Sequence, residues 1–291
     1  MLHVRELGLV YPDGTRALAG VTLEAGPGVL GLLGPNGAGK SSLMRVLATL
    51  QEPSAGSVRF GEVDALREPE RWRRSLGYLP QEFGVYPGVT TREMLDHMAV
   101  LKGIRERSSR RDVVDALLSR VNLWEARDRV LATLSGGMRR RFGVAQALIG
   151  DPGLLLLDEP SAGLDPAERH RLLDLVAEAG DRAVVLLSTH LVDEAAAICP
   201  RVVLLAGGRV RLDGTPADLT SALRGRVWRR ATERGDAPAA QAGLAVISAR
   251  LSGGRTVLRV LAKERPAESW EPAEPSLDDV YLTTVTDAGH G

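Results

Sequence analysis

The chain has 291 residues, enough for one large domain or two of modest size. It is 44% hydrophobic and 25% charged, and its 37 basic and 37 acidic side chains cancel, so the composition is that of an ordinary globular protein with no general attraction to nucleic acid or anionic lipid. The single cysteine, Cys199, excludes a disulfide framework and a cysteine-based metal site; residues 1–5 lack a signal-peptide pattern, and no run of 18 apolar residues predicts a membrane span.

The N-terminal part alternates in the manner of short strands over residues 1–25, with a turn at 11–14. The apolar run 29–33 then predicts a buried strand, and a helix is expected to open at 42–47.

Between this strand and helix, residues 34–41 read Gly-Pro-Asn-Gly-Ala-Gly-Lys-Ser and fit the phosphate-binding pattern G-x-x-x-x-G-K-[ST]. Glycine lets successive backbone N–H groups point at phosphate oxygens, Lys40 can reach the β- and γ-phosphates, and the Ser41 hydroxyl can bind Mg²⁺. A glycine-rich turn that fits by chance is the alternative, but a strand before it and a helix after it favour nucleotide binding.

The middle of the chain predicts strands that alternate with helices. Residues 91–149 have mostly helical periodicity, with breaks near Gly103 and at 134–137. The expected strands are 57–60, 154–157, 183–188 and 202–205, and residues 76–81 are expected to be a strand that ends in a loop. Apolar, β-branched strands that alternate with helices favour a mainly parallel sheet covered on both faces.

Two carboxylates follow the strand at 154–157, at the strand end where open α/β sheets bind ligands. Asp158 can hold Mg²⁺ opposite Ser41, and Glu159 can accept a proton from an attacking water. The alternative is a solvated pair in the turn before Pro160.

A second glycine-containing loop precedes a helix at 134–138, Leu-Ser-Gly-Gly-Met, and forms another anion site at a helix N-terminus. The arginines at 139–141 that follow are equally compatible with a solvated face. A second phosphate-binding loop in one chain suggests that it binds the nucleotide of another copy.

The composition changes after about residue 220, and we expect a small α+β subdomain over 221–291. Residues 237–240 resemble a linker or loose loop, 244–251 and 256–262 flank a hairpin turn, and 276–279 begin a last helix that ends near 285.

Together these stretches resemble the nucleotide-binding domain of ABC transporters over roughly residues 1–218. The family's motifs occur in the family's order: Walker A at 34–41, the Q-loop glutamine Gln81, the signature at 134–138, Walker B at 154–159, the D-loop at 161–165 and the switch histidine His190. Met138 departs from the family's glutamine, whereas Ser135 and Gly137 are intact, so activity is expected to be retained.

The resemblance implies an α/β fold with a P-loop NTPase core of ABC type over residues 1–220. That core comprises a mixed sheet, an antiparallel β-subdomain and a helical lobe at about 88–150, and the α+β subdomain at 221–291 follows it.

The resemblance also implies the role of each site residue, with ATP and Mg²⁺ as cofactors. Glu159, His190 and Gln81 are expected to be catalytic, and Ser41, Gln81 and Asp158 are expected to bind Mg²⁺. The residues expected to hold ATP are Tyr11 (stacked on adenine), Gly34, Pro35, Asn36, Gly37, Ala38, Gly39, Lys40, Ser41, Ser42, Ser135, Gly136, Gly137 and Asp165. Taken alone, without the resemblance, Tyr11 would be an aromatic residue of a turn.

In this family two copies pack head to tail, so the resemblance implies a homodimer in which Ser135 acts on the ATP of the partner copy. Phe83, Val85 and Tyr86 lie where the family docks a membrane subunit, although packing within the helical lobe is the alternative. Residues 78–90 and 276–282 look most like ATPase subunits of bacterial ABC-2 type exporters, whose permease is a separate chain. The implied location is the cytoplasmic face of the cell membrane.

Other functions stay open. An importer ATPase shares the same catalytic core, and a soluble ABC ATPase or a non-enzymatic nucleotide sensor are further alternatives. The arginines at 105–111 and 224–230 fit solvated surface better than nucleic-acid binding, which is not expected. His97 and His170 match no motif.

Overall fold

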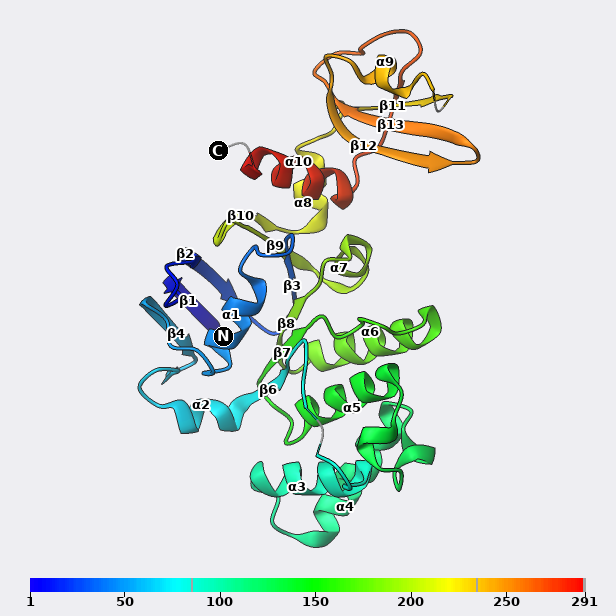
Figure 1. The fold of residues 1–291 in the computed structure, drawn as a ribbon. Helices are drawn as coiled ribbons and strands as arrows, with labels where there is room; N and C mark the ends of the chain where they lie inside the picture. Colours follow the sequence, from blue (N-terminus) through cyan, green and yellow to red (C-terminus); the bar gives the residue numbers. More distant parts are fainter. Residues whose placement is uncertain (85, 234, 290–291) are drawn as a thin grey trace. The chain divides into compact units, whose positions relative to one another are not determined.

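The computed structural model describes residues 1–84, 86–233 and 235–289, which form two compact units, Met1–Val210 and Arg211–Gly291 (Figure 1). This division falls earlier in the chain than the boundary expected between residues 220 and 221.

The first unit contains an antiparallel sheet, a larger central sheet and a group of helices. Its elements in chain order are β1 (Leu2–Val10), β2 (Arg16–Ala25), β3 (Gly28–Leu33), α1 (Lys40–Leu47), β4 (Ala55–Phe60), β5 (Val63–Asp64), α2 (Pro69–Ser75), β6 (Leu76–Leu79), α3 (Thr91–Leu101), α4 (Arg107–Arg120), two 3₁₀ turns (Trp124–Ala126 and Leu131–Thr133), α5 (Gly136–Leu148), β7 (Leu154–Asp158), α6 (Pro166–Gly180), β8 (Val184–Ser188), α7 (Val192–Ile198) and β9 (Arg201–Ala206). β10 (Arg209–Gly214) follows β9 after a two-residue turn.

The central sheet has the strand order β10-β9-β3-β8-β7-β6, and the pairs from β9 to β6 are parallel. Every residue of β7 and β8 is buried, which confirms the interpretation of these apolar runs as strands covered on both faces. The order places β3 beside β8 and β8 beside β7, so the loops that follow these three strands open at one edge of the sheet.

The second sheet, in the order β2-β1-β4-β5, is antiparallel. The turn expected at 11–14 is present, since the Gly14 N–H donates to the Tyr11 carbonyl, but the strands on either side are longer than expected. One apolar core joins both sheets through the buried face of α1, which contributes Leu43, Met44 and Leu47. The phosphate-binding loop and its helix are therefore held between two sheets.

The helical lobe consists of α3, α4 and α5, which lie together in Figure 1. Thr90 and Glu93 cap the start of α3 reciprocally, and Ser135 caps α5 by accepting a hydrogen bond from the Met138 N–H. The break expected near Gly103 is confirmed between α3 and α4. The break expected at 134–137 is shorter than predicted, because Gly136 and Gly137 already belong to α5.

The second unit holds a four-stranded sheet in the order β12-β13-β11-β14, with a small core of Leu258, Val260 and Trp270. Its elements are α8 (Pro216–Ser221), β11 (Val227–Thr232), α9 (Ala237–Gln241), β12 (Ala245–Ser252), β13 (Arg255–Leu261), β14 (Glu271–Pro272) and α10 (Leu277–Gly289). The hairpin and the last helix were expected, although α10 extends beyond residue 285.

The prediction of a loose loop at 237–240 was wrong, because these residues begin α9. Pro238 lies in the first turn, where a missing N–H removes no helical hydrogen bond, and alanine has the highest helix propensity. The Ala240 N–H donates to the Asp236 carbonyl, which closes the turn.

No helix within residues 1–84, 86–233 and 235–289 is long and apolar enough to cross a bilayer.

Candidate active site

The phosphate-binding loop runs from the end of β3 to the first residue of α1, which begins at Lys40 rather than at the expected Ser42. Two of its glycines are required by their surroundings. Gly34 has φ 154°, and a Cβ there would stand 2.3 Å from the Leu205 carbonyl oxygen. Gly39 has φ 104°, and its Cβ would stand 2.5 Å from the Ala17 carbonyl oxygen. At both positions the loop backbone packs directly against the backbone of another segment, and only glycine leaves room for this approach.

A cleft of about 440 Å³ opens in front of this loop and gathers many of the expected site residues. Its lining is Tyr11, Thr15, Arg16, Ala17, Pro35, Asn36, Gly37, Ala38, Gly39, Lys40, Ser41, Ser42, Gln81 and Glu159. The Tyr11 hydroxyl lies 3.1 Å from the Ser42 hydroxyl, so the turn after β1 is held beside α1.

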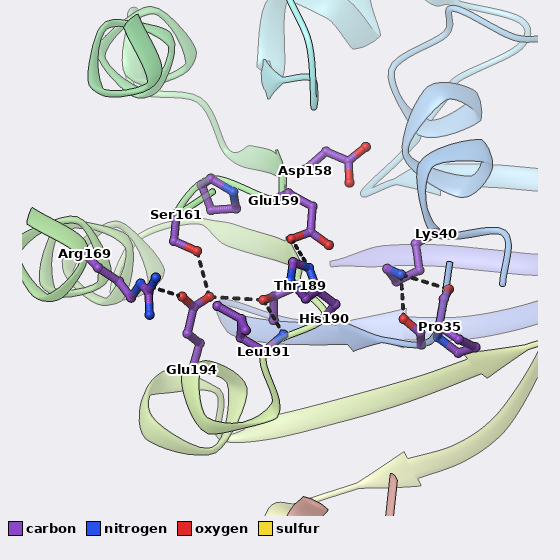
Figure 2. Close-up of polar contacts among 12 residues, drawn as sticks. Pro35, Lys40, Asp158, Glu159, Ser161, Arg169, Thr189, His190, Leu191 and Glu194 are labelled. Atoms are coloured by element: carbon purple, nitrogen blue, oxygen red, sulfur yellow. Dashed lines mark hydrogen bonds and ion pairs between the residues drawn. The ribbon is translucent and has the colours of Figure 1, made fainter. Parts of the chain in front are cut away.

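Lys40 is buried in the loop, and its ammonium donates to the carbonyl oxygens of Gly34 at 2.6 Å and Pro35 at 3.1 Å (Figure 2). Burial lowers the pKa of Lys40, and the nearby charges of Glu159 and Asp158 oppose that shift. Its partners are neutral carbonyls, so an incoming phosphate would be a stronger acceptor for this cation.

Glu159 and His190 meet because β7 and β8 are neighbours in the sheet. The register pairs Asp158 with Ser188, and the Glu159 N–H donates to the Ser188 carbonyl at 3.0 Å. His190, two residues after Ser188, then places its Nδ1 2.7 Å from Glu159 Oε2 (Figure 2). Glu159 itself has φ 54°, an uncommon conformation for a non-glycine residue.

The expected magnesium ligands all offer oxygen atoms, which Mg²⁺ prefers. Ser41 and Gln81 line the cleft, and the Asp158 side chain is 2% exposed. Within the part of the chain that the structure describes, Asp158 Oδ1 is buried and accepts no hydrogen bond. A buried carboxylate oxygen without a donor is suited to a cation, so this donor set fits Mg²⁺.

A buried carboxylate that sequence reasoning did not find lies behind this site. Glu194 Oε2 accepts hydrogen bonds from the hydroxyls of Ser161 at 2.8 Å and Thr189 at 3.0 Å, and Glu194 Oε1 forms an ion pair with Arg169 Nε at 3.3 Å (Figure 2). Ser161 follows β7 and Thr189 precedes His190, so Glu194 joins the two segments that carry Glu159 and His190. No motif or periodic pattern in the sequence pointed to Glu194.

Arg140 was also missed, since the arginines at 139–141 fitted a solvated face. Arg139 is exposed, but Arg140 is buried and its guanidinium donates to five backbone carbonyls.

The expected signature and D-loop residues do not line the cleft of the same chain. Ser135 and Asp165 are the N-caps of α5 and α6, where their side chains accept from the N–H groups of Met138 and Glu168. Gly136 and Gly137 form the first turn of α5. A role in ATP binding for these four residues stays a prediction.

The segment expected to dock a membrane subunit is partly visible. Tyr86 is 61% exposed, whereas Phe83 is half-buried and its ring lies against Gly143 of α5. Val85 lies outside the described residues. His97 and His170 are exposed.

Comparison with known proteins identifies the family. Residues 18–162 match the family profile described as "ABC transporter". The daunorubicin/doxorubicin resistance ATP-binding protein DrrA of Streptomyces peucetius is 37% identical, over 93% of this chain and 88% of its own. The phosphonates import ATP-binding protein PhnC 1 of Rhodopseudomonas palustris (strain HaA2) is 38% identical, over 78% of this chain and 86% of its own. A solved ATP-binding subunit of an ABC transporter, 30% identical, superposes with a TM-score of 0.71 over 76% of this chain and 92% of its own.

Proposed function

The chain belongs to the ABC transporter family and is an ATP hydrolase, and from this premise we propose that it energises the export of a substrate through a separate membrane subunit. The observation that carries the proposal is the meeting of the phosphate-binding loop, Glu159 and His190 at one edge of the central sheet. ATP binding and hydrolysis follow from family membership, whereas the residue roles, the partner and the direction of transport are proposals.

In the proposed mechanism the N–H groups of the loop and the Lys40 ammonium hold the β- and γ-phosphates of ATP. Glu159 accepts the proton of the attacking water, and His190, which contacts its carboxylate at 2.7 Å, orients it. Tyr11 stacks on the base from its place beside Ser42. Ser41, Gln81 and Asp158 would hold Mg²⁺, which when bound would supply positive charge next to the phosphates.

The signature residues complete the site from a second copy. Ser135, Gly136, Gly137 and Asp165 lie at helix N-termini outside the cleft of their own chain. We propose that they reach the ATP of a partner in a two-fold homodimer, where two equivalent sites form. Hydrolysis then removes the bridging γ-phosphate and lets the copies separate.

Export is favoured over import by the extent of the similarity. The alignment to DrrA covers 93% of the chain, so it must include most of the C-terminal unit, Arg211–Gly291. The alignment to the phosphonate import protein covers 78% and needs to include only a small part of that unit. We therefore propose that the chain works at the cytoplasmic face of the cell membrane as a drug-exporter type ATPase, with the importer ATPase as the second candidate.

The test uses a tagged Glu159→Gln protein, which should bind ATP and dimerise but hydrolyse it very slowly. Purified from membranes of the source cell in the presence of ATP, it should bring with it a multi-span membrane protein that lacks a nucleotide-binding domain. Phe83→Asp with Tyr86→Asp should release that partner and leave ATP binding unchanged. Recovery of a soluble dimer alone, or of ribosomes or DNA, would refute the transport proposal.

A further inference from the structure

Arg140 is a buried cation whose hydrogen-bonding capacity is fully used. It projects from α5 and is 6% exposed. Nε donates to the Pro160 carbonyl at 3.3 Å, Nη1 donates to the carbonyls of Pro80 at 2.9 Å and Gln81 at 2.7 Å, and Nη2 donates to the carbonyls of Asp158 and Glu159. A guanidinium has five N–H donors, so each of them has an acceptor.

The five acceptors belong to two separate segments of the site. Pro80 and Gln81 follow β6, whereas Asp158 is the last residue of β7 and Glu159 and Pro160 follow it. The donor comes from the helix whose first turn carries the signature glycines. One side chain therefore connects three stretches that the proposed mechanism uses.

The backbone of Glu159 needs such support. Its φ of 54° is a strained conformation that a non-glycine residue keeps only where the surrounding structure holds it. The carbonyls of Asp158 and Glu159 both accept from Nη2, so they converge on one nitrogen instead of pointing apart. The peptide planes on both sides of the Glu159 Cα are thereby oriented, and with them the direction of its carboxylate.

The positive charge of the guanidinium also lies close to the carboxylates of Asp158 and Glu159. Its partners are neutral carbonyls, while the carboxylates of Asp158 and Glu159 act on it from nearby. The two carboxylates thus remain available for Mg²⁺ and water while a buried positive charge offsets theirs.

We propose that Arg140 is a positioning residue for ATP hydrolysis, which fixes the Glu159 backbone and the Q-loop in one geometry and joins both to the signature helix. The inference rests on the proposed role of Glu159 as the base. Because Arg140 contacts no residue of the phosphate-binding loop through these bonds, its loss should impair the chemical step and leave nucleotide binding largely intact.

The test compares Arg140→Gln and Arg140→Lys with the parent, and Arg139→Gln serves as a matched control because Arg139 is the exposed neighbour on the same helix. Steady-state kinetics give kcat and KM for ATP, binding of a fluorescent ATP analogue gives Kd, and urea unfolding verifies the fold. We expect kcat of Arg140→Gln to fall by about 10- to 100-fold, as for a misplaced catalytic group, while Kd changes by less than about 3-fold. Lysine has three donors and should restore part of the rate. Arg139→Gln should match the parent.

A kcat for Arg140→Gln within about 2-fold of the parent would overturn the inference, as would an equal loss of kcat and ATP affinity. If Arg140→Gln fails to fold, Arg140→Lys decides, since an unchanged kcat and KM would equally overturn it. Glu159→Gln measured alongside separates the two proposals. Parent-like hydrolysis by Glu159→Gln would refute the base assignment, whereas a normal rate for Arg140→Gln beside an inactive Glu159→Gln would overturn the Arg140 inference alone.

Discussion

Replacing Glu194 by alanine should destabilise the first unit strongly, because this carboxylate is the acceptor for two buried hydroxyls. Ser161 is 1% exposed and Thr189 is 0% exposed, and both donate to Glu194 Oε2. Without an acceptor each hydroxyl carries a desolvation penalty of about 1–3 kcal/mol. The ion pair to Arg169 adds little, since the Arg169 side chain is 35% exposed and solvent screens it. The expected loss in the free energy of unfolding is therefore about 2–6 kcal/mol.

Differential scanning calorimetry suits this measurement, because the chain has two compact units that need not unfold together. We expect the transition of the first unit to fall by about 5 °C or more and that of the second unit to stay in place. Asp193→Ala is the matched control, since Asp193 is the exposed acidic neighbour in the same first turn of α7.

A double-mutant cycle identifies the cause. Ser161→Ala should cost less stability in the Glu194→Ala background than in the parent, with a coupling energy of about 0.5–3 kcal/mol. Additive effects of the two substitutions, or a shift of the first transition below about 2 °C, would refute the reasoning from unsatisfied hydroxyls.

Three further substitutions or probes test other parts of the chain. Burial raises the pKa of the Cys199 thiol to about 12, so a thiol reagent at pH 8 should label Cys199 only as the protein unfolds. The stability that the protonated thiol contributes should be lost as pH rises from about 9 towards 12. Burial alone would raise the pKa of Asp279, but hydrogen bonds from Arg259 and Ser276 hold that pKa below its usual value. Arg259→Met should therefore lower the free energy of unfolding of the second unit, measured by calorimetry at neutral pH, by about 3–5 kcal/mol. In the parent, the stability that ionised Asp279 contributes should be lost as pH falls below about 3.8. Gly39→Ala places a Cβ 2.5 Å from a carbonyl oxygen at φ 104°, so the Kd of a fluorescent ATP analogue should rise by about 10-fold or more.

The sequence predicted those parts of the site that follow from strand order and local chemistry. Apolar runs of strand length identify β3, β7 and β8, and the residues after parallel strands gather at one edge of a sheet. α2 could not be predicted in this way, because its only buried residue is Trp72, which leaves no periodic pattern. The helix α9 was misassigned because a proline among alanines reads equally as a loop or as a first helical turn.

Arg140 carried a signal that charge obscured. It shares one helical face with Gly143, Val144 and Ala147, at the spacing i, i+3, i+4 and i+7, and all three are buried. Arg139 and Arg141 fall outside this face. The periodicity thus predicts that Arg140 is buried, whereas three adjacent positive charges favour a solvated surface. The buried cation is tolerated because five backbone carbonyls accept its hydrogen bonds. A buried arginine could be predicted from the pattern, but not its acceptors, because these come from distant parts of the chain.

Glu194 and Arg140 both bind the short segment 158–161, Arg140 as a hydrogen-bond donor and Glu194 as an acceptor. Arg140 binds the carbonyls of residues 158–160, and Glu194 accepts from the hydroxyl of Ser161, the next residue. Glu159 lies inside this doubly held turn, and its carboxylate meets His190, whose preceding residue Thr189 is also bound by Glu194. Because both side chains hold the backbone around Glu159, a displacement of α5 or of α7 would shift this backbone and with it the Glu159 carboxylate. In a dimer whose partner contacts the start of α5, this linkage would make the geometry of Glu159, the proposed base, sensitive to whether the second copy is in place.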